Sequence, residues 1–359
     1  MIRRIILCLL VGGSICLADD RKDDLHAYFV RSCESHKFMG AASVTVNGET
    51  KFAEACGWAD AEWKVGNTTD TRFRAGSIAK QFTAAAVLLL YQDGRISLSD
   101  PIGKYLPDLP DSWRPATIHQ LLTHTSGVPI PDYDALFKLY PLGPTPTQMV
   151  ALLRDNPLLY PHGTRLTYNN VGYILLGFLI EKISGIEYER FVQERLFDQL
   201  GMRESGFDDI HKIVPRRARG YALDGAGMRN ADPIDPRWAW SAGGFYSTVH
   251  DLTVWSEALA QGKLLNPDST KRMFTIYSET LLEGMHYGYG VVLTERFGHE
   301  LQYHGGGIRG FTSVLQRYPQ VNLVIAVMSN LDSDTTPPPI DSWVVGDGLA
   351  KIWFHSQSQ

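Results

Sequence analysis

The chain has 359 residues, of which 44% are hydrophobic and 20% are charged. This composition is typical of a globular protein with a large core, and it excludes a disordered tail or a fibre. The length corresponds to two or three domains, or to one domain with a large insertion. The formal net charge of −5 argues against nucleic acid as a partner, because nucleic-acid binding requires a clustered basic surface.

The first 18 residues have the pattern of a secretory signal peptide. Arg3 and Arg4 precede an apolar run over 5–11, and small residues follow as far as Ala18, after which we expect cleavage. A membrane anchor and a buried N-terminal helix are the alternatives, but the run is far shorter than the ~18 residues that a spanning helix needs. We therefore expect an exported protein, periplasmic or secreted, with no transmembrane helix in its mature form.

Cleavage at that point would leave two of the four cysteines, Cys33 and Cys56. In an oxidising compartment these two can form one disulfide, and two free thiols are the alternative. The chain has neither a Cys-x-x-Cys nor a His-Glu-x-x-His motif, and its 11 histidines are scattered. We therefore expect neither a metal nor a cofactor.

The predicted elements follow one another as helix, strands, helices, strands and helix. Residues 24–37 have helical apolar spacing, and the turn Asn47-Gly48 joins two short strands, 41–46 and 51–55, in a hairpin. Further elements are expected at 82–92, 171–183 and 188–200 (helices), at 289–294, 300–303, 312–317 and 323–328 (strands), and at 342–354 (a helix).

This order predicts an α+β fold, in which an antiparallel sheet is flanked by the N- and C-terminal helices and a large helical lobe is inserted. The alternating pattern of a doubly wound sheet is absent. We expect residues 19–359 to form one domain, with an α/β lobe over about 22–70 and 284–357 and a helical lobe over about 71–283.

Ser77 and Lys80 form the only Ser-x-x-Lys sequence in the chain, at the start of the apolar helix over 82–92. Residues three apart lie on one face of a helix, so the Lys80 amine can return to the Ser77 hydroxyl. A serine becomes a nucleophile when a neighbouring group takes its proton. A lysine among apolar residues can have its pKa lowered enough to share that task. The alternative is a helix cap with a solvated lysine nearby.

Two further elements carry candidate chemistry. Tyr168 can act as a general base if a cation such as Lys80 depresses its pKa, and Asn170 can bridge the lysine and a substrate amide. The alternative is a packed tyrosine with Asn170 as a helix cap. The second element is the glycine run that follows His304, which lets a ligand lie against the strand edge. Arg309, in the turn that follows, can meet a carboxylate.

Together these elements resemble the serine β-lactamases and penicillin-recognising peptidases, in particular the branch of class C β-lactamases, D-alanyl-D-alanine carboxypeptidases and related esterases. The family pattern is Ser-x-x-Lys, Tyr-x-Asn and Lys/His-x-Gly, which stands here at 77–80, 168–170 and 304–306. The segments 73–83, 117–127, 242–252 and 304–311 also look like family segments, and the likeness covers roughly residues 25–330. It implies a β-lactamase/transpeptidase-like fold.

The resemblance also implies roles for individual residues. Ser77 would be the acylated nucleophile, Lys80 its assistant and Tyr168 the general base. Ser77 and Gly307 would supply the N–H groups of an oxyanion hole. The substrate-binding residues would be Asn170, His304, Gly306, Gly307, Arg309 and Tyr221.

We therefore expect a serine hydrolase that acts through an acyl-enzyme on an amide or ester of a small molecule or peptide. A D-Ala-type peptide or a small ester is the first expectation. His304 stands where most class C β-lactamases have lysine and is only partly charged near neutrality, which puts efficient β-lactam hydrolysis in second place. A non-catalytic penicillin-binding sensor is the third reading. The oligomeric state does not follow from the sequence.

Overall fold

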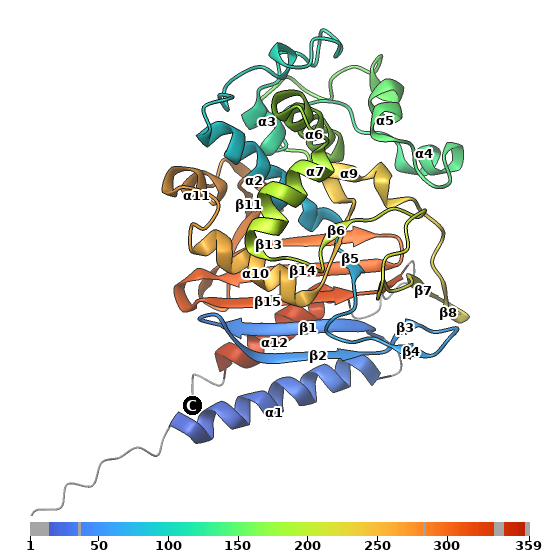
Figure 1. The fold of residues 1–359 in the computed structure, drawn as a ribbon, viewed down its shortest axis with the longest axis vertical. Helices are drawn as coiled ribbons and strands as arrows, with labels where there is room; N and C mark the ends of the chain where they lie inside the picture. The colour runs from blue at the N-terminus through green and yellow to red at the C-terminus, as the bar shows by residue number, and fades with distance from the viewer. Residues whose placement is uncertain (1–13, 35–36, 283, 334–340, 356–359) are drawn as a thin grey trace, which may run out of the picture.

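An eight-stranded antiparallel sheet lies at the centre of the computed structural model, which describes residues 14–34, 37–282, 284–333 and 341–355 (Figure 1). In sheet order its strands are β10 (Ser278–Leu282), β11 (Met285–Tyr287), β12 (Val292–Arg296), β13 (His299–Ile308), β14 (Phe311–Tyr318), β15 (Leu323–Ser329), β1 (Gly40–Val46) and β2 (Glu49–Cys56). Because β1 pairs with β15, the two ends of the chain meet in one sheet.

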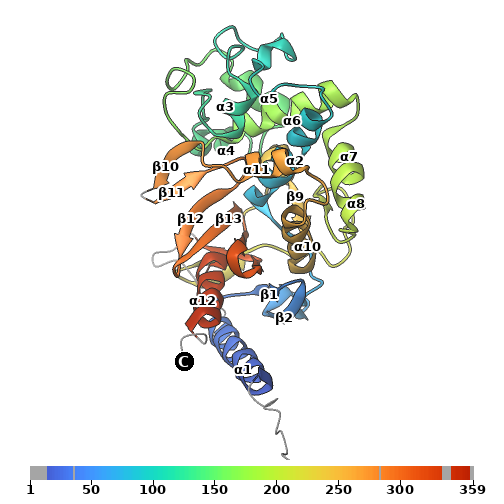
Figure 2. The same cartoon turned by 90° about the vertical axis from the view of Figure 1, so that its left-hand side faces the viewer.

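Two helices from the ends of the chain, α1 (Ser14–Cys33) and α12 (Ser342–His355), cover one face of this sheet and lie side by side (Figures 1 and 2). Leu25 and Phe29 from α1 share a buried cluster with Val345 and Leu349 from α12. A disulfide between Cys33 and Cys56 ties the end of α1 to β2.

The other face is covered by α10 (Val249–Ala260) and, beyond it, by α2 (Ala79–Gln92). Every residue of β15 is buried, since helices cover both of its faces. Phe82 of α2 stacks on Trp255 of α10 with ring centroids 3.9 Å apart. Helix α2 is apolar nearly all round because it runs through the interior between the sheet and the helical lobe.

The helical lobe surrounds the far side of α2 (Figure 1). Its helices are α3 (Ile118–Leu122), α4 (Tyr133–Leu139), α5 (Pro146–Leu153), α6 (Asn170–Ser184), α7 (Tyr188–Val192), α8 (Asp198–Leu200), α9 (Trp240–Gly243) and α11 (Pro267–Met273). Short strands form small sheets apart from the central one: β3 (Trp58–Asp60), β4 (Val65–Gly66), β5 (Phe73–Arg74), β6 (Gly206–Phe207), β7 (Tyr221–Asp224), β8 (Gly227–Asn230), β9 (Phe245–Ser247) and β16 (Leu331–Ser333). Short 3-10 turns include η2 (Gly76–Ile78) and η5 (Pro236–Trp238).

The predicted fold class is confirmed, with differences in detail. The helix expected to end at residue 37 ends at Cys33, and the helix expected over 188–200 contains a π-helical stretch over 193–197. The strand expected from residue 289 begins at Val292, because Gly290 has a positive φ of 71° and turns against the backbone of Lys80. Although α10 lies within the segment expected to be helical lobe, it packs on the sheet.

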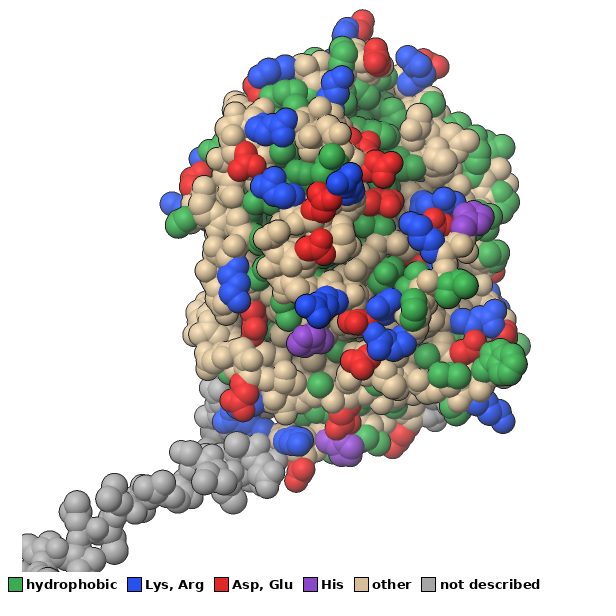
Figure 3. All heavy atoms as spheres, viewed as in Figure 1, with side chains coloured by type: hydrophobic (Ala, Val, Ile, Leu, Met, Phe, Trp, Pro, Cys, Tyr) green, Lys and Arg blue, Asp and Glu red, His purple; other side chains and the backbone are tan. Residues whose placement is uncertain are grey.

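The predicted signal peptide lies mostly outside the described residues, and its residues 14–18 belong to α1. Within the described ranges, every helix is too short or too polar to cross a membrane. On the face drawn in Figure 3, basic and acidic side chains of the described residues are intermixed.

Candidate active site

Ser77 lies in the turn η2, directly before α2 and against the glycine run of β13. A Cβ at Gly76 would lie 2.8 Å from the backbone nitrogen of Gly307. A Cβ at Gly306 would lie 2.0 Å from the carbonyl oxygen of Ala75. Only glycine allows so close an approach at positions 76 and 306, so Gly76 and Gly306 let the strand lie against the partly exposed Ser77.

Lys80 is the centre of the polar contacts in the site. Its Nζ lies 3.1 Å from Ser77 Oγ, and it donates to Asn170 Oδ1 at 2.8 Å and to the carbonyl oxygen of Ala242 at 2.8 Å. These partners come from η2, α6 and α9, so the amine joins three separate elements. The spacing of three residues brings Ser77 and Lys80 together as the sequence predicts.

The Lys80 side chain is fully buried, and no acidic side chain in the described part of the chain pairs with it. Burial without a counter-charge disfavours the ammonium form. Desolvation therefore lowers the pKa of Lys80 well below its ordinary value. A neutral amine beside a serine hydroxyl can accept the proton of that hydroxyl.

Asn170 connects Lys80 to the helical lobe. Its Oδ1 accepts from Lys80, and its Nδ2 donates to Tyr133 Oη at 2.9 Å. The sequence offered Asn170 as a possible helix cap, but the cap of α6 is Asn169, whose side chain accepts from the backbone N–H of Val171. The Asn170 amide is therefore free to serve the site, and Tyr133 of α4 is a contact that the sequence did not reveal.

Tyr168 lies over Lys80, with the amine 4.7 Å from the centroid of its ring. We expected the cation to depress the pKa of Tyr168, and the structure shows the opposite. Burial raises the pKa of Tyr168 above its ordinary value, and the neighbouring Ser77 hydroxyl offsets only part of the rise. Within the described residues, Tyr168 Oη has no hydrogen-bond partner. Because desolvation also lowers the pKa of Lys80, the lysine is a weak source of positive charge for a tyrosinate.

His304 is buried and neutral rather than partly charged. Its Nδ1 donates to the carbonyl oxygen of Gly305 at 2.6 Å, and its Nε2 then accepts from Tyr287 Oη at 3.0 Å. Desolvation, followed by the proximity of Lys80, lowers the pKa of His304 to about 3. The expectation of a partial positive charge at this position is therefore wrong, because burial removes the charge. Tyr287 is a second contact that the sequence did not reveal.

Arg309 stands at the turn between β13 and β14. Its guanidinium lies 4.4 Å from the centroid of the Phe137 ring and donates to the carbonyl oxygens of Pro141 and Pro233 at 3.4 and 3.5 Å. Among the described residues it has no acidic partner. It lines a cavity of about 790 Å³ whose ionised side chains are five cations and one acid: Arg74, Lys212, Arg217, Arg219, Arg309 and Asp232.

Tyr221, like Arg309, is a predicted site residue that has no described contact with the network around Lys80. It is buried beside Met39 and Leu331, and its hydroxyl accepts from the backbone N–H of Ala61 at 2.7 Å. No described contact joins it to Ser77 or Lys80.

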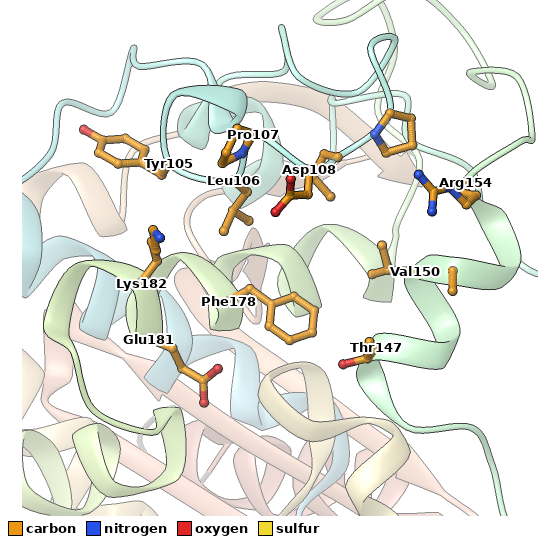
Figure 4. Close-up of a pocket in the computed structure, with 13 residues that line it drawn as sticks. Tyr105, Leu106, Pro107, Asp108, Thr147, Val150, Arg154, Phe178, Glu181 and Lys182 are labelled. Atoms are coloured by element: carbon orange, nitrogen blue, oxygen red, sulfur yellow. The ribbon is translucent and has the colours of Figure 1, made fainter.

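A second hollow, of about 650 Å³, lies between α5, α6 and the loop over 105–110 (Figure 4). Phe178 points into it, and Asp108, Arg154, Glu181 and Lys182 stand around it. None of the residues around Lys80 lines this hollow. In the described part of the chain, no group of His, Cys, Asp or Glu side chains is arranged to hold a metal ion.

A serine hydroxyl, a buried amine and a tyrosine brought together on this fold are the site of a serine hydrolase of the β-lactamase type. The Beta-lactamase family model matches residues 25–350, and the chain belongs to this family. PbpX of Bacillus subtilis, which is named a penicillin-binding protein, is 30% identical over 240 residues. That match covers 66% of this chain and 59% of PbpX, so the chain spans less than two thirds of that relative.

Two solved structures are similar over nearly the whole chain. A penicillin-binding protein from Bacillus halodurans matches with a TM-score of 0.79 and 29% identity, covering 92% of this chain and 98% of that one. The D-amino acid amidase of Ochrobactrum anthropi matches with a TM-score of 0.80 and 25% identity, covering 95% of this chain and 99% of that one. The chain is therefore a serine hydrolase whose family acts on amide or ester bonds.

Proposed function

We propose that the protein hydrolyses an amide or ester through an acyl-enzyme on Ser77. The observation that supports this most directly is the 3.1 Å contact between the Ser77 hydroxyl and the buried amine of Lys80, which has no acidic partner among the described residues. Neutral Lys80 takes the hydroxyl proton while Oγ attacks the carbonyl carbon. The N–H groups of Ser77 and Gly307 face the developing oxyanion.

The proton then leaves by way of Tyr168. Because Tyr168 keeps its proton at neutral pH, it can donate that proton to the departing nitrogen or oxygen as the bond to the carbonyl carbon breaks. Lys80 then returns the proton that it took from Ser77 to Tyr168. Asn170 holds the lysine during both transfers. A water molecule repeats the sequence on the acyl-enzyme and releases the acid. This assignment makes Lys80 the base and Tyr168 the proton donor, which reverses the expectation from sequence.

A D-amino-acid amide or peptide, or a small ester, is the substrate class that we favour. The similarity to a D-amino acid amidase and to penicillin-binding proteins supports it. The neutral His304 supports it as well, because a β-lactamase of the class C type places a fixed cation there. We further propose that the protein is exported, as the N-terminal pattern indicates.

Arg309 is the group that we propose meets an acid group of the substrate. It lies two residues beyond Gly307 in the chain. Among the cations that line the 790 Å³ cavity, Arg309 differs in that its hydrogen bonds in the described structure go to carbonyl oxygens alone. By contrast, Arg74 and Arg217 share the buried carboxylate of Asp208. Arg309→Gln should raise KM for a D-Ala-D-Ala peptide about 10-fold or more and leave a neutral nitrophenyl ester unchanged.

The decisive experiment is a substrate comparison with mass spectrometry of the trapped acyl-enzyme. A D-phenylalanine amide, a D-Ala-D-Ala peptide, p-nitrophenyl acetate and a chromogenic cephalosporin are offered to the wild type and to Ser77→Ala. We expect a mass increase on Ser77 and turnover of the amide or the ester. Acylation by the cephalosporin without turnover of any substrate would support the sensor reading instead. Full activity in Ser77→Ala would refute the mechanism.

A further inference from the structure

His124 is a fully buried histidine that the proposed mechanism does not use. It follows α3 and has a positive φ of 59°. Its ring lies 4.4 Å from the ring of Tyr168 and 4.7 Å from that of Tyr287, measured between centroids. Tyr173 is a third neighbour, at 5.0 Å. The side chain thus stands inside the aromatic wall of the site, in contact with the proposed proton donor.

Two hydrogen bonds to His124 hold the backbone on either side of Tyr168. The N–H of Thr167 donates to the carbonyl oxygen of His124 at 2.9 Å. The N–H of Asn169 donates to Nδ1 of the His124 ring at 3.1 Å. Thr167 and Asn169 are the immediate neighbours of Tyr168 in the chain, so His124 holds the backbone on both sides of it.

The contact with Asn169 also defines the state of the ring. A backbone N–H can only donate, so Nδ1 must be unprotonated, and the single proton of the neutral ring is on Nε2. Within the described residues, Nε2 is buried without a hydrogen-bond partner. Keeping an unpartnered donor inside the protein costs free energy. A residue chosen only for packing would avoid this cost, whereas one that must offer an acceptor at the Nδ1 position could not.

We propose, on the basis of the function proposed above, that His124 is a positioning residue, which fixes Tyr168 relative to Ser77 and Lys80 through its Nδ1 acceptor. The loop that carries Tyr168 has little regular structure of its own before α6 begins at Asn170. Effective proton transfer requires hydrogen-bond reach, and a displacement of about 1 Å can cost on the order of 100-fold in rate. The two hydrogen bonds made by His124 to Thr167 and Asn169 hold Tyr168 in place, although His124 is not itself one of the catalytic groups.

Two amide substitutions test the acceptor by its position. In His124→Asn, Oδ1 stands the same number of bonds from the backbone as Nδ1, and asparagine tolerates a positive φ. In His124→Gln, the oxygen stands at the distance of Nε2. We expect His124→Gln to lower the acylation rate constant about 10- to 100-fold with KM changed less than about 3-fold, and His124→Asn to recover most of that loss.

His119 supplies the matched control. It lies in α3, five residues before His124, and its Nδ1 pairs with Tyr289 Oη at 2.7 Å, away from the catalytic loop. His119→Gln should therefore alter stability while leaving the acylation rate constant within about 2-fold of the wild type. Stopped-flow acylation by p-nitrophenyl acetate, with thermal unfolding of each variant, gives both readouts.

Equal acylation rates in His124→Asn and His124→Gln would overturn the proposal, as would an equal loss in His119→Gln. If His124→Gln does not fold, His124→Asn alone decides the matter. A fall in its acylation rate constant of 10-fold or more, although the acceptor is retained, would contradict the proposal. Failure of the proposed function itself is seen separately, as acylation that persists in Ser77→Ala.

Discussion

Lys80 Nζ donates a 2.8 Å hydrogen bond to Asn170 Oδ1, and this contact joins the first turn of α2 to the first turn of α6. The two residues are 90 positions apart in the chain. An amide oxygen accepts a hydrogen bond from the amine and adds no charge to the site. A carboxylate at the same place would instead favour the ammonium form.

Asn170→Asp is therefore the substitution that tests the charge of Lys80. The new carboxylate should raise the pKa of the lysine, so that at pH 7 the base is protonated. We expect kcat/KM at pH 7 to fall about 10-fold or more, and the acid limb of the pH–rate profile to move up by about one unit or more. In the control, Asn170→Ala, activity should fall without that movement. An unmoved limb in Asn170→Asp would mean that Lys80 is not the base.

Replacing Lys80 by methionine should abolish catalysis and also remove a buried amine whose desolvation lowers the free energy of unfolding. The folded-state pKa lies below the unfolded-state value, so between the two the unfolded chain binds more protons than the folded chain. Stability of the wild type therefore rises with pH in that window, by up to about 1.4 kcal/mol per unit. Lys80→Met has no titrating group at this position, so it lacks this rise in stability with pH. Measured by urea unfolding, its stability relative to the wild type should decrease from pH 7 to pH 9, and a constant difference would contradict the assignment.

The buried histidines should make the protein sensitive to acid. Burial lowers the pKa of His304 to about 3 and that of His124 well below its ordinary value. Below about pH 6.5 the unfolded chain protonates while the folded chain does not, so stability falls as the pH drops toward the folded pKa values, by up to about 1.4 kcal/mol per unit for each group. Unfolding of His304→Gln followed between pH 7 and pH 4 should show a shallower decline, and an identical slope would count against a neutral His304.

The disulfide should contribute to stability without touching the chemistry. Cys33 and Cys56 are separated by 23 positions and join α1 to β2, which lie on the sheet away from the helical lobe (Figure 1). A closed loop of this length is worth about 3 kcal/mol through the entropy of the unfolded chain. Cys33→Ser with Cys56→Ser should lower the free energy of unfolding by about that amount and leave kcat unchanged. A loss of kcat in the folded double variant would show that the sheet end and the site are coupled.

The order of the elements and the three short motifs could be predicted from the sequence because both are local. The apolar pattern of α2, the glycine run after His304 and the spacing between Ser77 and Lys80 depend on residues within a few positions of one another. The partners that come from elsewhere could not be found in this way. Tyr133 and Tyr287 carry no pattern that separates them from the other tyrosines, and only the packing of α4 and β11 brings them to the site.

The charges of the site were the part of the sequence interpretation that the structure corrected. Residue type alone led us to expect a tyrosine with a depressed pKa and a partly charged histidine. Burial acts on every group at once: it lowers the pKa of Lys80 and of His304 and raises that of Tyr168. The sequence by itself determined the family and the α+β architecture, and it pointed to Ser77 and Lys80 as neighbours. The direction in which each of these pKa values moves was decided only by the tertiary structure, because desolvation depends on what surrounds a side chain in space.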